Sequence, residues 1–443
     1  MKKIFLIVIV MMFILAFSLA QAADGGIDWK QASGANIVFA TYVGGEADYL
    51  DSLLPEFKNL TGINVSIEQY PEIQLWEKAQ LDTVSGTGTI DAFTMDMMRI
   101  PEFAGSGYIV EVQQLLDDPK LTDKAWYQPE DILAGPLSAA KYKGVLFGIP
   151  YTAETNLFMY RKDIFKEKGV QVPKTFDELW AVAEKINDPN GTYAIGIRGQ
   201  RGSGMNIYTW TQFFRGFGAS FFKDFPNDMT PTVNTPEAIE ATKYYAEILQ
   251  KFGPPGIANW TNMEIYTAQA NGKIAMTMDA NAFGAIIEDE NTSKTRGLWG
   301  YAMVPGGKGG TWPAVYSHIM CINKFSKNKE AAWLFLQWAS SKDITLKRGL
   351  KTGVPARASS WNSPELKEKL WYIGEGAYTE MCLESLKIAD AQYRPIFPNW
   401  NEMGDILGIA VQSVIAGGNT AEDALNKAQK DIEVMLKKNG YIK

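Results

Sequence analysis

The stretch that decides the fold runs from residue 36 to residue 96 and reads NIVFATYVGGEADYLDSLLPEFKNLTGINVSIEQYPEIQLWEKAQLDTVSGTGTIDAFTMD. Short β-rich runs alternate in it with stretches of helical periodicity, in the order 36–42, 46–61, 63–69, 73–85 and 90–95. Gly62 follows the first helical stretch directly, at a position where glycine commonly ends a helix. This β-α-β-α-β order predicts an α/β fold with a parallel sheet covered by helices.

Sheets of this kind bind ligands at the carboxyl ends of their strands, in the loops that follow. The first such loop, residues 41–48, contains Tyr42 and Glu46. The second, residues 96–101, begins with Asp96. These two loops are therefore the first candidates for a ligand site.

A second set of elements follows Pro150. Strands are expected at 193–197, 273–278, 299–304 and 319–323, and helices at 175–186, 236–251, 329–340 and 420–438. Thr175 and Glu178 have the spacing of a capping box, and Thr420 is the expected cap of the last helix. A chain of 443 residues with two such sets usually forms two domains.

The first 22 residues have the order of a secretory signal peptide. Lys2 and Lys3 form a basic region, residues 4–19 carry no charge, and Ala20-Gln21-Ala22 has the small-x-small pattern of a cleavage site. A permanent membrane anchor is disfavoured, because a spanning helix needs about 20 apolar residues and this run is shorter. No cysteine lies near the cleavage point, which argues against a lipoprotein. We therefore expect an exported, unanchored chain in the periplasm.

The chemistry that the sequence lacks removes several classes of protein. The net charge of −7 argues against nucleic acid, whose phosphates need clustered Lys and Arg. His318 is the only histidine, and no HExxH, paired CxxC or Walker-type GxxxxGK[ST] motif occurs, so we expect no metal and no cofactor. A glycosidase needs only two carboxylates, and with 50 Asp and Glu residues that alternative stays open.

Six groups of sequence blocks occur in a characteristic order. They are LPEF (54–57) with TGINV (61–65), DAFTMD (91–96) with EFAGSGY (102–108), YKGVLFGIP (142–150) with YRKD (160–163), GKIAM (272–276), NKFSKNKEAA (323–332) and GVPAR (353–357). In this order and spacing the chain resembles the extracellular solute-binding proteins of family 1. These are the carbohydrate-binding components of ABC importers and include maltose-binding protein.

The resemblance implies the two-lobed periplasmic binding protein fold of type II, with the ligand in a cleft between lobes that close by a hinge motion. It puts the crossing segments near Ala153, Tyr316 and Gly353. It implies a lobe one formed by residues 23–153 plus 317–351, and a lobe two formed by residues 154–316 plus 352–443.

The same resemblance, together with the chemistry of a sugar, gives the expected ligand residues. A sugar presents hydroxyl groups at its rim, which suit carboxylates, amides and Arg, and C–H faces, which suit aromatic rings. His318 is expected to be a structural neighbour of the hinge. The expected ligand residues are Tyr42, Glu46, Asp96, Glu154, Tyr208, Trp210, Asp279, Asn281, Trp312, Tyr316 and Arg357.

The expected function is capture of a sugar, short oligosaccharide or sugar alcohol and its delivery to the membrane permease of an ABC importer, by a monomer without enzymatic activity. A polyamine or an organic anion is the alternative ligand class, and a secreted glycosidase is the alternative from another class. A polyamine site would need several carboxylates and aromatic rings with no Arg nearby.

The resemblance also bears on Cys321 and Cys382, because it places them in different lobes. A disulfide needs Cα atoms within about 7 Å. We therefore predict two free thiols, although export to an oxidising compartment usually pairs an even number of cysteines.

Overall fold

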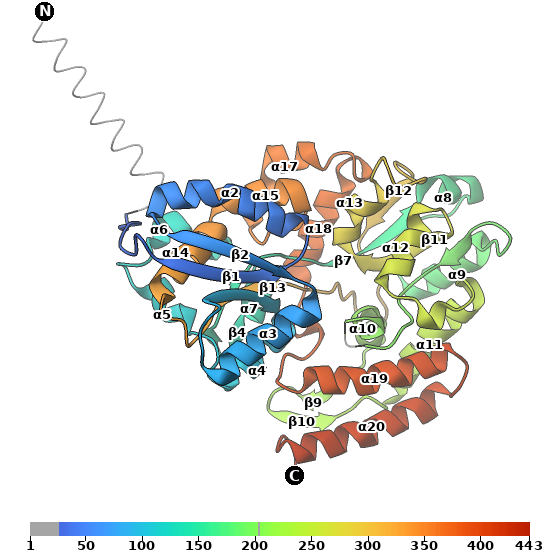
Figure 1. Cartoon of the computed structure of the whole chain (residues 1–443). Coiled ribbons are helices and arrows are strands. Elements are labelled where there is room, and N and C mark those ends of the chain that lie inside the picture. The colour runs from blue at the N-terminus through green and yellow to red at the C-terminus, as the bar shows by residue number, and fades with distance from the viewer. Residues whose placement is uncertain (1–25, 203) are drawn as a thin grey trace, which may run out of the picture.

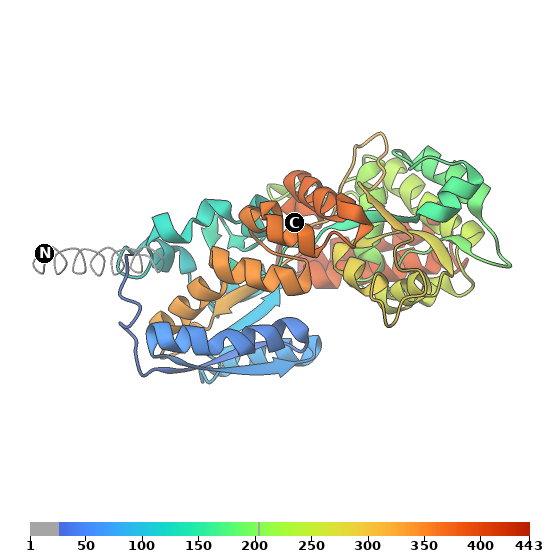
Figure 2. The same ribbon diagram turned by 90° about the horizontal axis from the view of Figure 1, so that it is seen from above.

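The computed structural model describes residues 26–202 and 204–443. The expected signal peptide, residues 1–22, lies outside these described residues. Figure 1 shows two α/β bodies side by side, and the view from above in Figure 2 shows chain segments passing between them. Each body is built on its own β-sheet. The body that contains residues 36–96 is lobe one, and the other body is lobe two.

The sheet of lobe one has five strands in the order β2-β1-β3-β13-β6. Strands β1, β2 and β3 are parallel, whereas β13 runs antiparallel to β3 and to β6. The crossover connections between β1, β2 and β3 are helical, as parallel pairing requires. The strands are β1 (Asn36–Tyr42), β2 (Asn64–Tyr70), β3 (Ala92–Asp96), β6 (Ile149–Pro150) and β13 (His318–Ile322).

Helices from two distant parts of the chain cover this sheet. Phe335 of α14 packs edge-on against Phe39 of β1 and Phe57 of α2, which joins the two parts in one core. A small hairpin of β4 (Lys141–Tyr142) and β5 (Val145–Leu146) packs against helices α4, α5 and α7 of the same lobe. The helices are α2 (Gly45–Thr61), α3 (Glu72–Ser85), α4 (Ile100–Gly105), α5 (Val112–Asp117), α6 (Lys124–Tyr127), α7 (Ala134–Ala139), α14 (Lys329–Ala339) and α15 (Lys342–Thr352).

The sheet of lobe two has four strands in the order β12-β7-β11-β8. Strand β11 is parallel to β8 and antiparallel to β7, so the carboxyl ends of β8 and β11 lie at the same edge. All seven residues of β11 are buried, in keeping with its mostly apolar sequence IAMTMDA. The strands are β7 (Asn156–Arg161), β8 (Tyr193–Ile195), β11 (Ile274–Ala280) and β12 (Trp299–Ala302).

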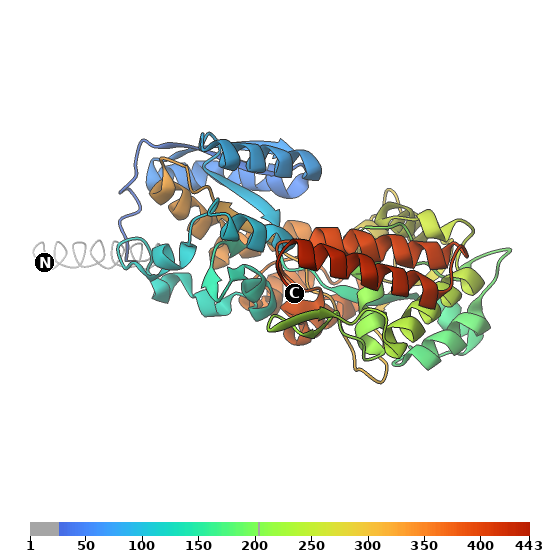
Figure 3. The same ribbon diagram turned by 90° about the horizontal axis from the view of Figure 1, so that it is seen from below.

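Helices pack around this second sheet, and α19 and α20 lie along its lower side as an antiparallel pair (Figure 3). A hairpin of β9 (Phe222–Asp224) and β10 (Asp228–Pro231) lies next to α20. The helices are α8 (Lys162–Lys168), α9 (Phe176–Ile186), α10 (Asn206–Gly216), α11 (Pro236–Phe252), α12 (Asn262–Ala270), α13 (Gly284–Ile287), α19 (Trp400–Ile415) and α20 (Ala421–Lys438).

Three segments run side by side between the lobes. Thr152 pairs with Pro355, and Glu154 pairs with Tyr316, each through an isolated antiparallel bridge. The main-chain N–H of Ala153 also donates to the carbonyl of Val354 at 3.0 Å. These contacts lie where the sequence leads us to expect crossing segments.

Helices α16 (Ala358–Asn362), α17 (Pro364–Lys369) and α18 (Ala377–Ile388) follow the last crossing and contact both lobes. α16 and α17 pack against α15 of lobe one, while α18 packs against β7 and β12 of lobe two. The assignment of residues 352–443 to lobe two alone, and with it the exact division of the chain into lobes, therefore stays a prediction.

The local signals in the sequence match the elements closely. The Thr175–Glu178 capping box is present at the start of α9, and the Thr420 side chain accepts a hydrogen bond from the Asp423 N–H at the start of α20. Gly62 ends α2 with φ at +73°, a conformation that favours glycine. Within the described residues, no helix has both the length and the apolarity needed to cross a membrane.

The two cysteines are free thiols, as predicted. Cys321 is buried in the core that includes the lobe-one sheet, and Cys382 is buried in a separate cluster with Leu157, Trp299 and Tyr378. Burial raises the pKa of Cys382 to about 12, so this thiol stays protonated and behaves as a small apolar residue.

Candidate functional site

A cavity of about 500 Å³ lies between the two lobes, at the crossing segments. Lobe one contributes residues from the loop after β1 and from the start of β13, lobe two contributes residues from η4 (Asn281–Phe283) and α13, and the crossing segments supply the rest. Its lining residues are Thr41, Tyr42, Val43, Gly44, Gly45, Glu46, Ala47, Tyr151, Thr152, Glu154, Ala282, Ile286, His318, Thr352 and Val354.

The lobe-one wall is formed where β1 and β3 end and β13 begins. The ring centres of Tyr42 and His318 are 4.2 Å apart, and Asp96 is the register partner of His318 across β3 and β13. Trp76 of α3 donates from Nε1 to the Tyr42 hydroxyl oxygen at 3.1 Å, which fixes the tyrosine ring. Tyr42 and Asp96 are therefore neighbours at the sheet edge where ligands are expected.

The next part of the wall holds Glu46 in a charge pair. Glu46 lies in the first turn of α2 and forms an ion pair with Arg348 of α15, which is almost fully buried. The Arg348 guanidinium carbon lies 3.3 Å from the ring centre of Tyr151, and Arg348 Nη2 donates to the Tyr151 carbonyl at 2.8 Å. Glu46 thus presents a carboxylate whose charge is already balanced.

Lobe two holds an aromatic cluster at the carboxyl ends of β8 and β11, next in sequence to the cavity-lining Ala282. Tyr208 and Phe283 pack there with Tyr393, and Trp312 and Tyr316 pack against the same cluster. The Tyr393 hydroxyl donates to the Tyr208 carbonyl at 2.6 Å. Tyr208 is 4% exposed, and its hydroxyl has no hydrogen-bond partner within the described residues.

Two arginines flank this cluster. The guanidinium carbon of Arg198 lies 4.8 Å from the Tyr208 ring centre, and that of Arg394 lies 5.3 Å from it. Arg198 also holds Asp279 in a two-point contact, with Nε donating to Oδ2 at 2.9 Å. Asp279 is fully buried, so this carboxylate positions Arg198 at the end of β11 and is not itself open to the cavity.

Asp96 links the two sides electrostatically. Its partial burial raises the pKa of the carboxyl above the ordinary value of 3.8, although the positive charges of Arg394 and Arg99 oppose that shift. Asp96 Oδ1 accepts the N–H of Met98 at 2.9 Å and so caps the short helix η1 (Met97–Arg99). Arg394 is nearly fully buried and also lies 6.0 Å from the ring centre of Tyr316.

Tyr42, Glu46 and Glu154 line the cavity, whereas the other eight expected ligand residues do not, and three of these eight are engaged elsewhere. Trp210 is 0% exposed and packs inside lobe two, 4.5 Å from the ring centre of Phe214. Asn281 is also fully buried, and its Oδ1 accepts the N–H of Thr155 at 3.0 Å. Arg357 donates to the carbonyls of Ser340 and Gln128, so its guanidinium fastens the last crossing to lobe one.

Trp312 lies at the aromatic cluster but outside the cavity lining. Its indole Nε1 donates to the Gly309 carbonyl at 2.8 Å, and the Arg215 guanidinium lies 5.0 Å from its ring centre. The ring is partly exposed and packs on the aromatic cluster, but it does not line the cavity.

The structure adds cavity residues that the sequence did not single out as ligand residues, chiefly Tyr151 and His318. Tyr151 directly follows the YKGVLFGIP block and lies three residues before Glu154. Its position in the sequence could therefore have identified it as a candidate ligand residue. Arg348, which balances Glu46, lies within the helical run of α15 and carried no such signal.

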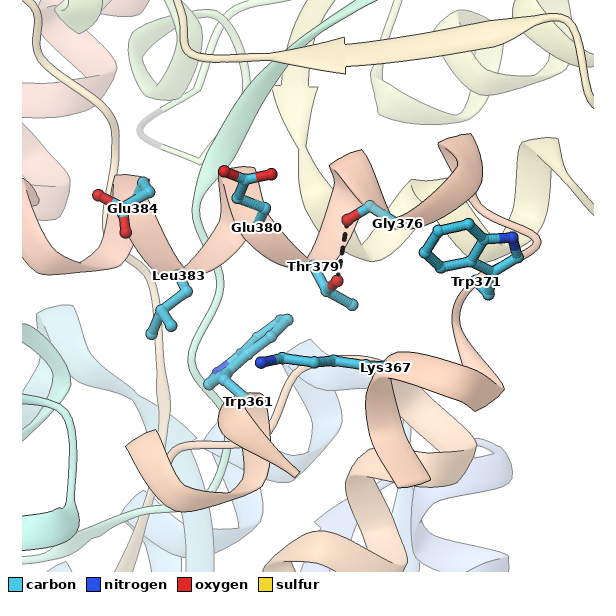
Figure 4. A pocket seen from close by; sticks show the side chains of 8 residues that line it. All are labelled: Trp361, Lys367, Trp371, Gly376, Thr379, Glu380, Leu383 and Glu384. Atoms are coloured by element: carbon cyan, nitrogen blue, oxygen red, sulfur yellow. Dashed lines mark hydrogen bonds between the residues drawn. The ribbon is translucent and has the colours of Figure 1, made fainter. Parts of the chain in front are cut away.

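A second, smaller cavity of about 280 Å³ lies between α16, α17 and α18 (Figure 4). It is lined by Trp361 and Trp371 and by the exposed carboxylates of Glu380 and Glu384. Thr379 Oγ1 donates back to the Gly376 carbonyl at 3.0 Å, and Glu384 pairs with Lys387. No expected ligand residue lines it, whereas Tyr42, Glu46 and Glu154 line the cavity between the lobes, which is therefore the candidate site.

The site has no metal-binding geometry of its own. Among the residues that the structure describes, no three His, Cys, Asp or Glu side chains are grouped so that they could hold a metal ion.

Two lobes with a polar, aromatic-rimmed cavity at three crossing segments define the class of two-lobed solute-binding proteins. The chain belongs to the bacterial extracellular solute-binding protein family, whose model matches residues 44–345.

Three similar proteins illustrate the relationship. The mannitol-binding protein of Pseudomonas aeruginosa is 26% identical, over 85% of this chain and 89% of its own length. The erythritol/L-threitol-binding protein of Mycolicibacterium smegmatis is 26% identical, over 91% of this chain and 86% of its own. An ABC transporter solute-binding protein from Agrobacterium radiobacter K84, solved in complex with ribitol, has a TM-score of 0.79 and 29% identity. It covers 90% of this chain and 98% of its own.

Proposed function

We propose that this protein is the substrate-binding protein of an ABC importer and that it captures a neutral, acyclic sugar alcohol of about four to six carbons. The observation that carries the proposal is the charge balance of the site, where carboxylates and guanidinium groups face one another. Such a site suits a ligand that has many hydroxyl groups and no charge.

The charge balance argues against both alternative ligand classes. Glu46 at the cavity pairs with Arg348, and Asp96 beside the cavity-lining His318 interacts with Arg394 and Arg99. A polyamine would need carboxylates without arginines nearby, and an organic anion would need guanidinium groups without carboxylates. Burying either charged ligand against paired groups would leave its charge uncompensated, which is costly in a closed site.

The aromatic rings argue for an acyclic ligand over a sugar ring. A pyranose stacks its flat C–H face on an open aromatic face. One side of the Tyr42 ring contacts His318, Arg198 and Arg394 lie by the Tyr208 ring, and Trp210 is in the core. The site therefore offers hydrogen bonds more readily than stacking platforms, which suits a chain of hydroxyl groups. The names of the three similar proteins, which refer to mannitol, erythritol or threitol, and ribitol, support the same class.

The wider setting follows from the family. We propose export through cleavage after Ala22, residence in the periplasm without a lipid anchor, action as a monomer, and delivery of the ligand to the transmembrane permease subunits. We also propose that the ligand leaves unchanged, because Glu46, one of the two carboxylates that line the cavity, pairs with Arg348, whereas a glycosidase needs one free acid and one free base or nucleophile.

Titration calorimetry with a panel of solutes tests the proposed ligand class. Ribitol, D-mannitol and erythritol represent the alditols, maltose and glucose the sugars, spermidine the polyamines and citrate the organic anions. We expect at least one alditol to bind with a Kd at least 100-fold below those of maltose, spermidine and citrate. Tighter binding of any of these three would contradict the proposed class, and chemical conversion of the bound solute would point to an enzyme.

Lobe closure is a separate expected outcome. The crossing segments are joined by single bridges and border the cavity, so a ligand that contacts both lobes should favour the closed form. Small-angle scattering with saturating ribitol should give a smaller radius of gyration at unchanged mass. An unchanged radius, with binding verified in the same sample, would argue against a hinge.

A further inference from the structure

We propose that His318, the only histidine of the chain, is a direct contact of the ligand whose neutral ring recognises one hydroxyl group. The inference rests on the proposed function, because it concerns how a polyhydroxylated ligand is read at the same cavity. It changes the role expected for His318 from the sequence, where a structural place beside the hinge was favoured.

The position of the ring is set by its neighbours on both flanks. The Tyr42 ring centre lies 4.2 Å from that of His318, and the Tyr316 ring centre lies 5.3 Å from it in an edge-on arrangement. Tyr42 is held in turn by the Trp76 indole. A ring fixed in this way is ordered before the ligand arrives, so little conformational entropy is lost when it forms a new hydrogen bond.

The main chain of His318 is equally fixed. Its N–H donates to Thr152 Oγ1 at 3.0 Å, and its carbonyl accepts the N–H of Tyr151 at 2.7 Å. Within residues 26–202 and 204–443, the hydrogen bonds of His318 are all made by these main-chain groups. The residue lines the cavity, and on this ground we infer that its ring exchanges a hydrogen bond with a bound solute.

The ring is uncharged under ordinary conditions. Burial lowers the pKa of His318 from 6.5 to about 4. The neighbouring charged groups are Asp96 on the adjacent strand, Glu46 on α2 and Glu154 on the first crossing, with Arg394 near Asp96. A neutral imidazole has one donor and one acceptor, the same pair that a hydroxyl group offers, and it leaves the charge balance of the site intact.

The single histidine allows a direct measurement in the wild-type protein. With ¹⁵N-labelled histidine, the two ring nitrogens of the mature protein give one set of signals. We expect one neutral tautomer without ligand and a clear shift of at least one ring nitrogen when the alditol that binds best in calorimetry is added. Unchanged ring signals at saturation would overturn the inference.

Two kinds of variant separate hydrogen bonding from packing. His318→Phe keeps an aromatic ring between Tyr42 and Tyr316 but removes both nitrogens, and we expect its Kd for the alditol to rise at least tenfold. His318→Asn and His318→Gln each supply an amide donor and acceptor, and we expect one of them to stay within fivefold of the wild type. Thermal unfolding of each variant checks that the protein is folded.

The outcomes distinguish the two proposals. An alditol that binds wild type and His318→Phe equally well overturns the role of His318 and leaves the proposed function standing. Smaller losses in His318→Phe than in both amide variants would mean that the ring acts through packing, which also overturns the inference. A wild-type protein that binds none of the alditols overturns the proposed function, and this inference with it.

Discussion

Replacing Asp96 with alanine is expected to raise the Kd for ribitol at least tenfold, about 1.4 kcal/mol. Asp96 ends β3 beside the cavity-lining His318, and Arg394 and Arg99 favour its ionised form. A carboxylate in a site closed to water accepts hydroxyl hydrogen bonds that nothing else replaces. Isothermal titration of ribitol into the variant and the wild type measures the change.

Asp96→Asn refines this experiment, because the side chain of Asp96 also caps η1 through the Met98 N–H. The amide oxygen can keep that cap while the negative charge is lost. We expect Asp96→Asn to unfold at nearly the wild-type temperature and still to bind more weakly. Asp117→Ala, which removes an exposed carboxylate of α5 in the same lobe, is the matched control and should bind normally. Normal ribitol affinity in both Asp96 variants would remove Asp96 from the site.

The raised pKa of Asp96 gives this site a pH dependence with a definite direction. A carboxyl group with a pKa above 3.8 takes up its proton at a higher pH than an ordinary aspartate does. If the ligand binds the ionised form, affinity is constant near pH 7 and falls on acidification, starting above the pH at which an exposed Asp would titrate.

Much of the fold could be predicted because its signals are local. The alternation of strands and helices from residue 36 to residue 96, the capping box at Thr175 and the C-terminal Gly62 each depend on residues that are neighbours in sequence. The parallel order of β1, β2 and β3 then places Tyr42 and Asp96 at one sheet edge. Strand order was therefore sufficient to predict that these two residues lie at one edge of the sheet.

The other half could not be predicted because it depends on distant partners. Asp279 meets Arg198, which is 81 residues away in sequence, and Arg357 meets the Gln128 carbonyl, 229 residues away. Whether a carboxylate faces a ligand or an arginine is decided by such contacts, and no motif records them. Tyr208 and Trp210 differ for another reason: both belong to α10, where residues two apart point in widely different directions.

Trp210→Ala is the second substitution with a large expected effect, and it should act on stability and not on binding. The Trp210 side chain is fully buried between α10 and α11, and its Nε1 donates to Thr242 Oγ1 at 3.0 Å. Truncating a buried tryptophan leaves a cavity and costs about 3–5 kcal/mol in the free energy of unfolding. Urea unfolding followed by circular dichroism measures this loss, and Trp210→Phe should recover part of it.

Trp371→Ala is the matched control, because that tryptophan is 59% exposed and lies away from the cavity between the lobes. We expect it to change the free energy of unfolding by no more than about 0.5 kcal/mol, as exposed substitutions usually do. At a temperature where Trp210→Ala is still folded, its Kd for ribitol should stay within about threefold of the wild type, since no atom of the site is removed. Unchanged stability with lost affinity in Trp210→Ala would contradict this prediction. It would mean that the Trp210 side of α10 faces the ligand and not the core.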